Sequence, residues 1–588
     1  MKKSIFIIFI YVSFSSIFGQ TTLKKDNSFT YNNFPQEKIF VHFNSTLLIS
    51  GEELFYKIYC LNTNTNKLSS LSKIAYVELI NTDKNTIFKH KILLKSGLGE
   101  GYFFIKTSIP SGNYKLIAYT QWMRNGGVNT FFQNDITIIN PFRANKKLTV
   151  NQSEHQNTIK SQNNLFKKHV KILENPVKND FVELCSNKKT FLKREKVVLT
   201  IKSTKGKFSY GNYSVSVKKI DSIDTSKRHS SSSFTSNNNL KASPKDSIFY
   251  MPELRGEILS GTVFIKESNT PISSAKISFS IPGENSIFKI ATTNKSGVFY
   301  FNLDKEYKNT NAIIQVIGSK KDEYSVVLKK YKSPNYNDFE FYDFKLTSEL
   351  KGLILNKSIL SQIENAYHSV KKNSILPTNS MIPSYKYKEK QYFLDDYTRF
   401  KTLNETITEV VGSIYVLRKK GDYTFHIKHY NEASKSDLLP LVLIDGILIQ
   451  NHNSIIDYNA KNIKSIGVVR DKYIYGGQSY MGVISIKTLD GDYNSSFKEW
   501  EYMKSIELDK PLVGIKYFKQ TYSDNFNLNR IPDFRSQLLW SPNLTLRADE
   551  NIISFYTSDN TGDYEICIEG FTNSGKPVSL REIIKVKG

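Results

Sequence analysis

Short apolar runs that alternate with polar residues dominate residues 36–140 of this chain. Alternation with a period of two is typical of half-buried strands, and the Asn, Ser, Gly and Thr clusters between the runs are typical of turns. Seven such runs at this spacing predict an antiparallel β-sandwich. The runs are EKIFVHF, ELFYKIYCL, KIAYVELI, IFKHKILL, GYFFIKTSI, GNYKLIAYT and NDITII.

The same alternation returns further along the chain. FVELC, KVVLTIK and NYSVSVKKI predict part of a second sandwich, and residues 256–330 predict another short all-β unit. Residues 414–490 alternate again around LVLIDGILI, where Asp445-Gly446 predicts a hairpin turn because glycine accepts a positive φ. More strands are predicted after residue 493. The predicted fold class is mainly β and multidomain, with tandem β-sandwiches and one small α+β domain.

Two segments change to a helical period. Apolar residues recur every three or four positions from about Ser358 to Val370, and again over residues 402–411, which predicts two helices. Two polar stretches lack any period. Residues 144–180 are interpreted as a linker, and the Ser-rich residues 221–247 as a disordered low-complexity loop.

The first nineteen residues predict a secretory signal peptide. Lys2 and Lys3 precede the apolar run from Ile5 to Val12, and Gly19 is a small residue before a plausible cleavage site. No later window holds 18 consecutive apolar residues, so no transmembrane helix is predicted. We expect an exported protein of the periplasm or the outer membrane, with the cell surface as the alternative.

Composition narrows the function classes. The net charge of +26 comes mostly from lysines spread along all 588 residues, which favours a solvated basic surface, with attraction to anionic envelope polymers as the alternative. No nucleic-acid-binding motif is present, and no nucleic-acid partner is expected. Three cysteines exclude a disulfide-rich scaffold and a four-cysteine zinc site. Cys60 and Cys567 lie in strand-like runs and are predicted to be buried apolar side chains.

The N-terminal region resembles the macroglobulin-type domain of exported Bacteroidota proteins. The resemblance is carried by EKIFVHFNSTLLISGEELFYKIYCLN and GYFFIKTSIPSGNYKLIAYTQWMRN. KKTFLKREKVVLTIKS followed by YSVSVKK resembles a further domain of that type. The thioester motif Cys-Gly-Glu-Gln is absent, so the resemblance does not imply a covalent protease trap.

Two other units show resemblances. ELRGEILSGTVFIKESNTPISSAKISFSIPG and TTNKSGVFYFNL resemble a carboxypeptidase-regulatory-like domain, which implies a small transthyretin-like sandwich without catalysis. PLVLIDGILI and NIKSIGVVRDKYIYGGQSYMGVISIKT resemble the plug domain of TonB-dependent outer-membrane receptors. In receptors a large barrel follows the plug, and we expect the 95 residues after Tyr493 to be too few to build one. RIPDFRSQLLWSPNLTL and ISFYTSDNTGDYEICIEGFTNSGK resemble the closing sandwich of such proteins.

Together, patterns and resemblances predict eight segments. These are a signal peptide (1–19), a macroglobulin-type sandwich (20–143), a linker (144–180), a second sandwich portion with the Ser-rich loop (181–252), a carboxypeptidase-regulatory-like sandwich (253–345), a helical linker (346–393), a plug-like domain (394–493) and a C-terminal sandwich (494–588).

No motif predicts catalysis. His426 and His429 would lie on opposite faces of a strand, and LDGDYN at 489–494 lacks the later glutamate and the flanking helices of a calcium loop. Gly-x-Ser-x-Gly, His-Glu-x-x-His and a phosphate loop are absent. Trp122 and Trp540 are interpreted as core anchors. We expect no enzyme activity, no metal and no cofactor.

The candidate site residues carry the plug resemblance. They are interpreted either as turn and packing positions or as contacts with an outer-membrane or periplasmic protein partner: Asp445, Gly446, Arg470, Tyr475, Gly476 and Gly482. The favoured hypothesis is a non-enzymatic envelope scaffold or binding protein associated with a barrel, secretion or uptake partner. The alternatives are a macroglobulin-like protease-capture protein and a secreted surface adhesin. The oligomeric state is left open.

Overall fold

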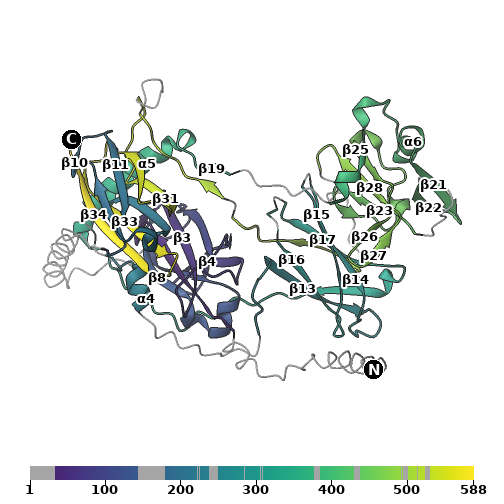
Figure 1. The fold of residues 1–588 in the computed structure, drawn as a ribbon, viewed down its shortest axis with the longest axis horizontal. Helices are drawn as coiled ribbons and strands as arrows, with labels where there is room; N and C mark the ends of the chain where they lie inside the picture. The colour runs from purple at the N-terminus through teal and green to yellow at the C-terminus, as the bar shows by residue number, and fades with distance from the viewer. Residues whose placement is uncertain are drawn as a thin grey trace, which may run out of the picture.

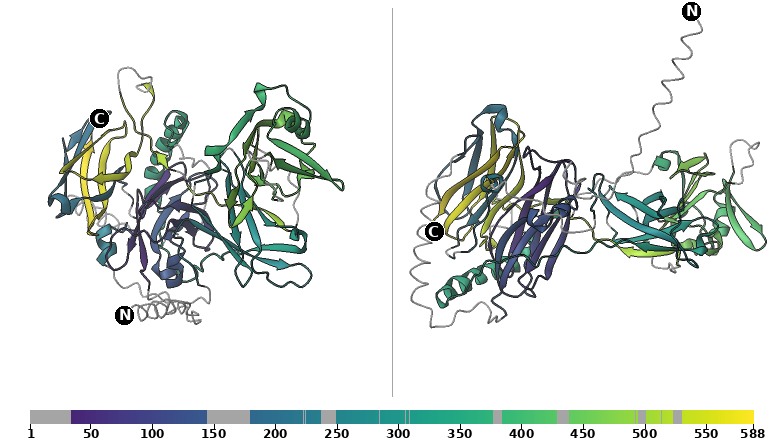
Figure 2. Two further views of the ribbon diagram at one scale, coloured as in Figure 1. Left: turned by 45° about the vertical axis from the view of Figure 1, so that its right-hand side comes forward. Right: turned by 90° about the horizontal axis from the view of Figure 1, so that it is seen from below.

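The computed structural model describes residues 34–143, 179–236, 249–376, 384–428 and 438–588, apart from positions 222, 224, 284, 305, 308, 492, 494–500, 513 and 523–529. The predicted signal peptide and nearly all of the predicted linker at 144–180 lie outside the described residues. The described chain is mainly β and multidomain, which confirms the predicted fold class. It forms two lobes, seen side by side in Figure 1 and from two further directions in Figure 2.

The first sandwich comprises residues 34–143. Three strands in the order β1-β3-β6 face five in the order β2-β8-β7-β4-β5. Apolar side chains of both sheets, such as Ile39, Leu79 and Leu116, are fully buried between them. The strands are β1 Glu37–Phe43, β2 Leu47–Ile49, β3 Glu53–Asn62, β4 Ile74–Asn81, β5 Thr86–Leu93, β6 Leu98–Phe104, β7 Gly112–Tyr119 and β8 Phe132–Ile139. The pattern predicted all of them except β2, which is too short to show an alternation.

The second sandwich is assembled from two distant segments. Strand β12 lies between β31 and β33 in one sheet, so residues 181–219 and 537–586 share a single core. The prediction of two separate units here is wrong, because four strands alone would leave their apolar face uncovered. The strands are β9 Val182–Ser186, β10 Thr190–Phe191, β11 Lys196–Ser203, β12 Gly211–Lys219, β31 Gln537–Leu546, β32 Glu550–Tyr556, β33 Gly562–Thr572 and β34 Pro577–Val586.

The two sandwiches share one plan. In chain order, strands 1, 3 and 6 form the smaller sheet and strands 2, 8, 7, 4 and 5 the larger, with strand 2 parallel to strand 8. The turn before the third strand has a positive φ in both, 98° at Gly51 and 57° at Arg194. The next residue, Glu52 or Glu195, accepts a hydrogen bond from the main-chain N–H three positions earlier, at 2.9 and 2.7 Å. The second sandwich therefore repeats the first, interrupted between its fourth and fifth strands by residues 220–536.

The second lobe begins with a third sandwich. Its sheets have the orders β16-β13-β18 and β15-β14-β17-β29, and β29 comes from the segment predicted to belong to the C-terminal sandwich. That assignment is wrong for β29, whose pairing partner is β17. The strands are β13 Glu257–Ile265, β14 Lys276–Ile281, β15 Ile287–Thr292, β16 Val298–Leu303, β17 Asn311–Ile317, β18 Tyr324–Leu328 and β29 Met503–Glu507.

The rest of the second lobe, residues 384–493, is named here the mixed-sheet unit. Its sheet has the order β20-β25-β28-β23-β24, and β20 comes from the end of the predicted helical linker. Helix α6 (Leu403–Glu409) confirms the helix predicted within 402–411, and Leu403 and Ile407 are fully buried. The strands are β20 Lys390–Phe393, β21 Ile414–Lys419, β22 Asp422–Ile427, β23 Leu441–Ile444, β24 Ile447–Leu448, β25 Ile463–Val469, β26 Tyr473–Tyr475, β27 Gln478–Tyr480 and β28 Val483–Thr488.

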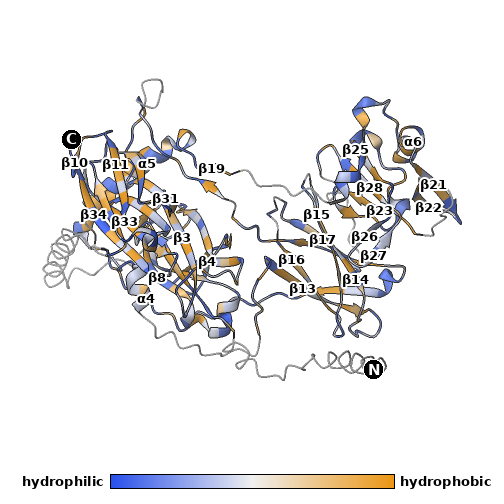
Figure 3. Ribbon diagram, viewed as in Figure 1, coloured by the Kyte–Doolittle hydropathy of each residue, from blue (hydrophilic) through white to orange (hydrophobic). Residues whose placement is uncertain are grey.

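Helix α5 (Lys351–Ala366) belongs to the first lobe and confirms the first predicted helix, although it begins before Ser358. Its Ile354 packs with Leu47 and Ile49 at the edge of the first sandwich. Beyond the helix, the short strand β19 (Ser374–Ile375) pairs with β30 (Ile515–Lys516) on the returning chain. Figure 3 shows hydrophobic and hydrophilic residues alternating along strands of both lobes.

Part of the Ser-rich loop is ordered, contrary to the prediction of disorder over 221–247. Residues 231–236 form the helix α4 (Ser231–Ser236), whose first residue is fully buried. The Ser231 N–H donates to Glu569 at 2.8 Å, and its hydroxyl donates to the Val578 carbonyl at 2.8 Å. The composition predicts disorder, but the N–H and the hydroxyl of Ser231 both form hydrogen bonds with the second sandwich. Residues 237–248 lie outside the described residues.

The chain passes between the lobes repeatedly. It enters the second lobe before β13, returns before α5, enters again before β20 and returns after β29. At the junction, the Lys91 ammonium group lies 2.6 Å from Glu257 and donates to the Asp509 carbonyl at 2.8 Å. The Lys91 side chain is 6% exposed, so this ion pair is largely shielded from water. These crossings and contacts join the two lobes.

Candidate functional site

The candidate residues of the mixed-sheet unit lie on turns, several of which face the third sandwich. Asp445 and Gly446 form the turn between β23 and β24 with φ of 48° and 88°, which confirms the predicted hairpin. The buried Asp445 carboxylate accepts hydrogen bonds from the Thr488 N–H at 2.9 Å and the Thr488 hydroxyl at 2.6 Å. Asp445 therefore locks the hairpin turn to the end of β28.

Three of the candidates contact β15 and the turn before it. A Cβ at Gly446 would lie 2.2 Å from Cβ of Ser286, and one at Gly476 would lie 2.3 Å from Cβ of Ile290. The Tyr475 hydroxyl donates to the Phe288 carbonyl at 2.7 Å, and its ring stacks on that phenylalanine. Only glycine fits at either position, because a side chain would collide with the third sandwich and because the backbone φ is positive.

The other two candidates act within the mixed-sheet unit. Gly482 has a φ of 86°, and a Cβ there would lie 2.3 Å from the Val469 carbonyl oxygen. The Arg470 guanidinium donates to the Lys428 carbonyl at 2.6 Å, beyond the end of β22. The structure therefore does not bring all six candidates together, and it gives most of them contacts inside this chain.

A separate cavity of about 320 Å³ lies in the first lobe, between the two sandwiches and α5. Its walls come from the β2–β3 turn and β3, the end of β12, the start of β31, helix α5 and the β30 segment. This volume is at the lower end of the range for small-molecule sites. No sequence motif marks this site, because its residues come from several separated stretches of chain.

Three of the lysines that line this cavity have partners. Lys357 lies 2.7 Å from Asp221 and 3.5 Å from Glu52. Lys371 lies 2.8 Å from Glu364, and the Lys219 ammonium group donates to Asn560. The acidic partners neutralise the charges of Lys357 and Lys371, whereas the Asn560 amide gives Lys219 a hydrogen bond without neutralising its charge.

Lys218 differs from the other three. Its side chain points away from the core of the second sandwich, since its neighbour Val217 is fully buried in that core. Lys218 is 8% exposed, and no hydrogen bond or ion pair joins its side chain to another residue of the described chain. Burial lowers its pKa to about 8.

An aromatic cluster forms another part of the wall. The rings of Phe55 and Trp540 are stacked with centroids 5.8 Å apart, and the Tyr517 ring meets Phe55 edge-on at 5.5 Å. Trp540 was predicted to be a core anchor, and it is 5% exposed at the cavity wall. Neither its indole N–H nor the Tyr517 hydroxyl forms a hydrogen bond of normal geometry with any described residue. The indole still lies close enough to lower the pKa of the Tyr517 hydroxyl slightly, against the larger effect of burial.

Glu53 adds a titratable group to the same wall. Burial raises the pKa of its carboxyl to about 7, against a smaller opposing effect of a hydrogen bond with Asn373. The neutral carboxyl is a hydrogen-bond donor as well as an acceptor. The cavity thus combines a buried ammonium group, donors without partners, an aromatic surface and a carboxyl group that titrates near neutrality.

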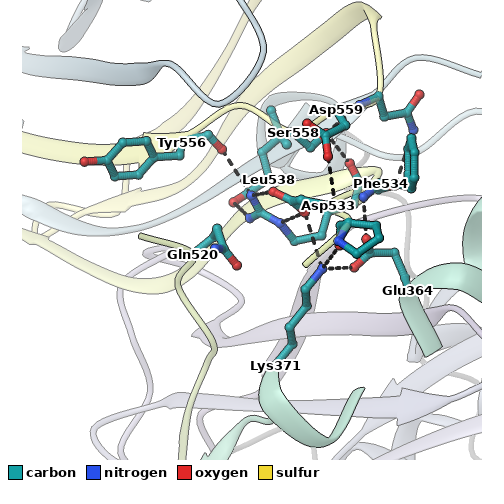
Figure 4. A network of polar contacts seen from close by, with 12 residues as sticks. Glu364, Lys371, Gln520, Asp533, Phe534, Leu538, Tyr556, Ser558 and Asp559 are labelled. Carbon is teal, nitrogen blue, oxygen red and sulfur yellow. Dashed lines mark hydrogen bonds and ion pairs between the residues drawn. The ribbon is translucent and has the colours of Figure 1, made fainter. Parts of the chain in front are cut away.

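A dense polar network closes the cavity on the side of α5. Figure 4 shows the Lys371 ammonium group between Glu364 and Asp533, at 2.8 and 3.6 Å. Asp533 is 1% exposed and accepts from the Arg535 guanidinium at 2.6 and 2.7 Å. Burial alone would raise the pKa of Asp533, but the adjacent Arg535 charge lowers it below its ordinary value. The network fixes α5 against the second sandwich.

Other candidate chemistry is limited. Within the part of the chain that the structure describes, no group of three His, Cys, Asp or Glu side chains is placed to hold a metal ion. His426 lies on β22 with its ring stacked on Tyr415, and His429 lies outside the described residues. Across the same described ranges, no helix has the length and apolar character needed to cross a membrane.

Comparison with known proteins gives distant structural neighbours. No protein-family model matches the chain, and no curated protein matches it. Salmonella alpha-2-macroglobulin reacted with methylamine is 7% identical with a TM-score of 0.24, covering 94% of this chain and 39% of that one. Escherichia coli alpha-2-macroglobulin activated by porcine elastase is 8% identical with a TM-score of 0.24, covering 94% and 44%. The chain spans about two fifths of the length of these structures.

Proposed function

We propose that this protein is an exported, non-enzymatic scaffold of the cell envelope that binds a protein partner of the outer membrane or periplasm. The observation that carries the proposal is the interleaved chain, which crosses repeatedly between the two lobes, and we infer that these crossings hold the lobes in one arrangement. The buried Lys91–Glu257 pair at the junction supports this rigidity. A rigid two-lobed body presents two surfaces at a constant separation, which suits a scaffold.

The contacts of the candidate turns restrict where a partner can bind. Gly446, Tyr475 and Gly476 pack on the third sandwich, so a partner would have to displace that sandwich to reach them. The β21–β22 hairpin of the same unit remains accessible, with Tyr415 39% and Leu417 47% exposed. We therefore assign the partner contact to this hairpin.

An affinity experiment tests the proposal. The tagged full-length protein is used to recover partners from solubilised outer membranes, beside a Leu417→Glu variant and a Phe208→Glu control. Phe208 is 74% exposed on the other lobe and makes a matched surface substitution. We expect a stoichiometric envelope protein with wild type and control but not with Leu417→Glu. Recovery of the wild-type protein alone, from the periplasmic or culture fraction, would contradict the scaffold.

Protease capture without a thioester is the second candidate. It requires an accessible segment for cleavage, and the Ser-rich residues 221–247 are the candidate segment. The described part of that loop, residues 225–236, is held between the sandwiches by Arg228 and Ser231. Brief digestion of the folded protein separates the candidates, because capture needs rapid cleavage within 221–247 and the scaffold does not.

A further inference from the structure

The cavity between the two sandwiches and α5 has features of a ligand site that the scaffold proposal does not use. Its wall holds an ammonium group, an indole N–H and a phenol hydroxyl, all at least nine-tenths buried and without a normal hydrogen bond among the described residues. Buried polar groups are nearly always hydrogen-bonded, so donors left without acceptors in a cavity indicate a missing acceptor.

The charges on the wall define that acceptor. Lys357 and Lys371 are paired with acidic residues, and Lys219 donates to the neutral side-chain amide of Asn560, whereas the Lys218 side chain has no partner within the described chain. A buried ammonium group without any side-chain partner favours a ligand group with a negative charge. The nearby carboxylates, Glu52 and Asp221 among them, disfavour a ligand with two negative charges, such as a phosphate monoester.

The aromatic cluster defines the rest of the ligand. Phe55, Trp540 and Tyr517 line the cavity, and aromatic ligand groups pair with aromatic side chains by stacking or edge-on contact. The size of the cavity, about 320 Å³, admits a small molecule. We propose that this cavity binds a small organic monocarboxylate with an aromatic body, whose carboxylate pairs with Lys218 and whose ring packs on Trp540.

Calorimetric titration of the full-length protein tests this site with 3-phenylpropionate as the probe. The uncharged 3-phenylpropan-1-ol has the same body without the carboxylate. We expect the carboxylate to bind at least about tenfold more tightly than the alcohol, a difference of about 1.4 kcal/mol. Equal affinities, or no binding of 3-phenylpropionate at millimolar concentration, would overturn the proposal.

Two variants assign the preference to Lys218. Lys218→Met keeps the aliphatic stem and removes the charge, and Lys202→Met is the control on an exposed position of β11. We expect the preference for the carboxylate over the alcohol to disappear in Lys218→Met and to persist in Lys202→Met. A Lys218→Met protein that folds and keeps the preference would refute the role of this residue.

A pH series on the wild-type protein gives a readout that needs no variant. The Lys218 ammonium group faces Glu52 at the β2–β3 turn, Asp221 after β12, Lys357 on α5 and Arg228. Because burial lowers its pKa to about 8, it loses its charge above that pH. Since the Glu53 carboxyl on the same wall has a pKa of about 7, the decline of the preference for 3-phenylpropionate between pH 8 and pH 10 is the readout for Lys218. A preference that stays constant over that range would contradict the assignment.

Discussion

Arg228 offers the most direct test of how the two sandwiches are held together. Its guanidinium donates to the Phe43 carbonyl at 3.1 Å and the Asn44 carbonyl at 3.2 Å, and it pairs with Glu565 on the second sandwich. The side chains of this pair are 12% and 16% exposed. One residue of the Ser-rich loop thus joins both sandwiches.

The size of its contribution follows from these contacts. Hydrogen bonds that involve a charged group contribute about 1.5–3 kcal/mol each. Replacing Arg228 with methionine removes two such bonds and one ion pair, while Glu565 keeps a weaker contact with Arg581 at 4.0 Å. Allowing for that remaining contact and for partial exposure, we expect a loss of about 3 kcal/mol. For a unit of roughly 200 residues, this lowers Tm by about 6–12 °C.

Thermal melting and limited proteolysis together measure this effect. Lys227→Met is the matched control, because that side chain is exposed and makes no contact seen among the described residues. We expect Arg228→Met to melt earlier and to be cleaved within residues 225–236, with the control unchanged. If both variants have the same Tm and the same fragments, Arg228 does not join the sandwiches.

Three further predictions follow from other parts of the structure. Gly446→Ala should loosen the contact with Ser286 and raise amide hydrogen exchange in β15, whereas Gly412→Ala, at an open position, should leave this exchange unchanged. If both variants exchange at the wild-type rate in β15, the close approach of Gly446 to Ser286 is contradicted. Burial raises the pKa of Glu253 to about 8, so the folded protein retains a proton that the unfolded chain releases, and stability should fall as pH rises from about 4.5 to about 8. In Glu253→Gln, the difference between the free energies of unfolding at pH 5 and pH 8, measured by denaturation, should shrink by roughly 4 kcal/mol. If the variant keeps the wild-type difference, Glu253 is not the group responsible. Cys185 is partly exposed and should react with a maleimide in the folded protein, whereas the two buried cysteines should react only after denaturation.

Much of the local structure was predictable because it depends on near neighbours. The Asp445-Gly446 pair specifies its hairpin through backbone conformation alone. Helix α6 follows from its period and from a capping box, in which Thr402 and Glu405 each bond the other's main-chain N–H. Cys567 lies in an alternating run and is buried as predicted.

The site was less predictable. Lys218 occupies a polar position of an alternating run, and such a residue is ordinarily solvated. Lys218 is buried because the first sandwich and α5 pack over this part of β12. The sequence pattern of one strand contains no information about what covers the outer face of that strand. The same limit applies to Tyr475, whose partner Phe288 is far away in the chain.

By itself, the sequence determined most of the strands, the helices α5 and α6 and the mainly β class, because hydrophobic periodicity and turn chemistry act over a few residues. Only the tertiary structure decided that residues 181–219 and 537–586 form one sandwich, that β29 joins the third sandwich, and that the Ser-rich loop is ordered at Ser231. The physical reason is that an apolar face must be covered, and any strand of suitable pattern can cover it. Which strand does so depends on the whole chain, as do the cavity and its unpaired lysine.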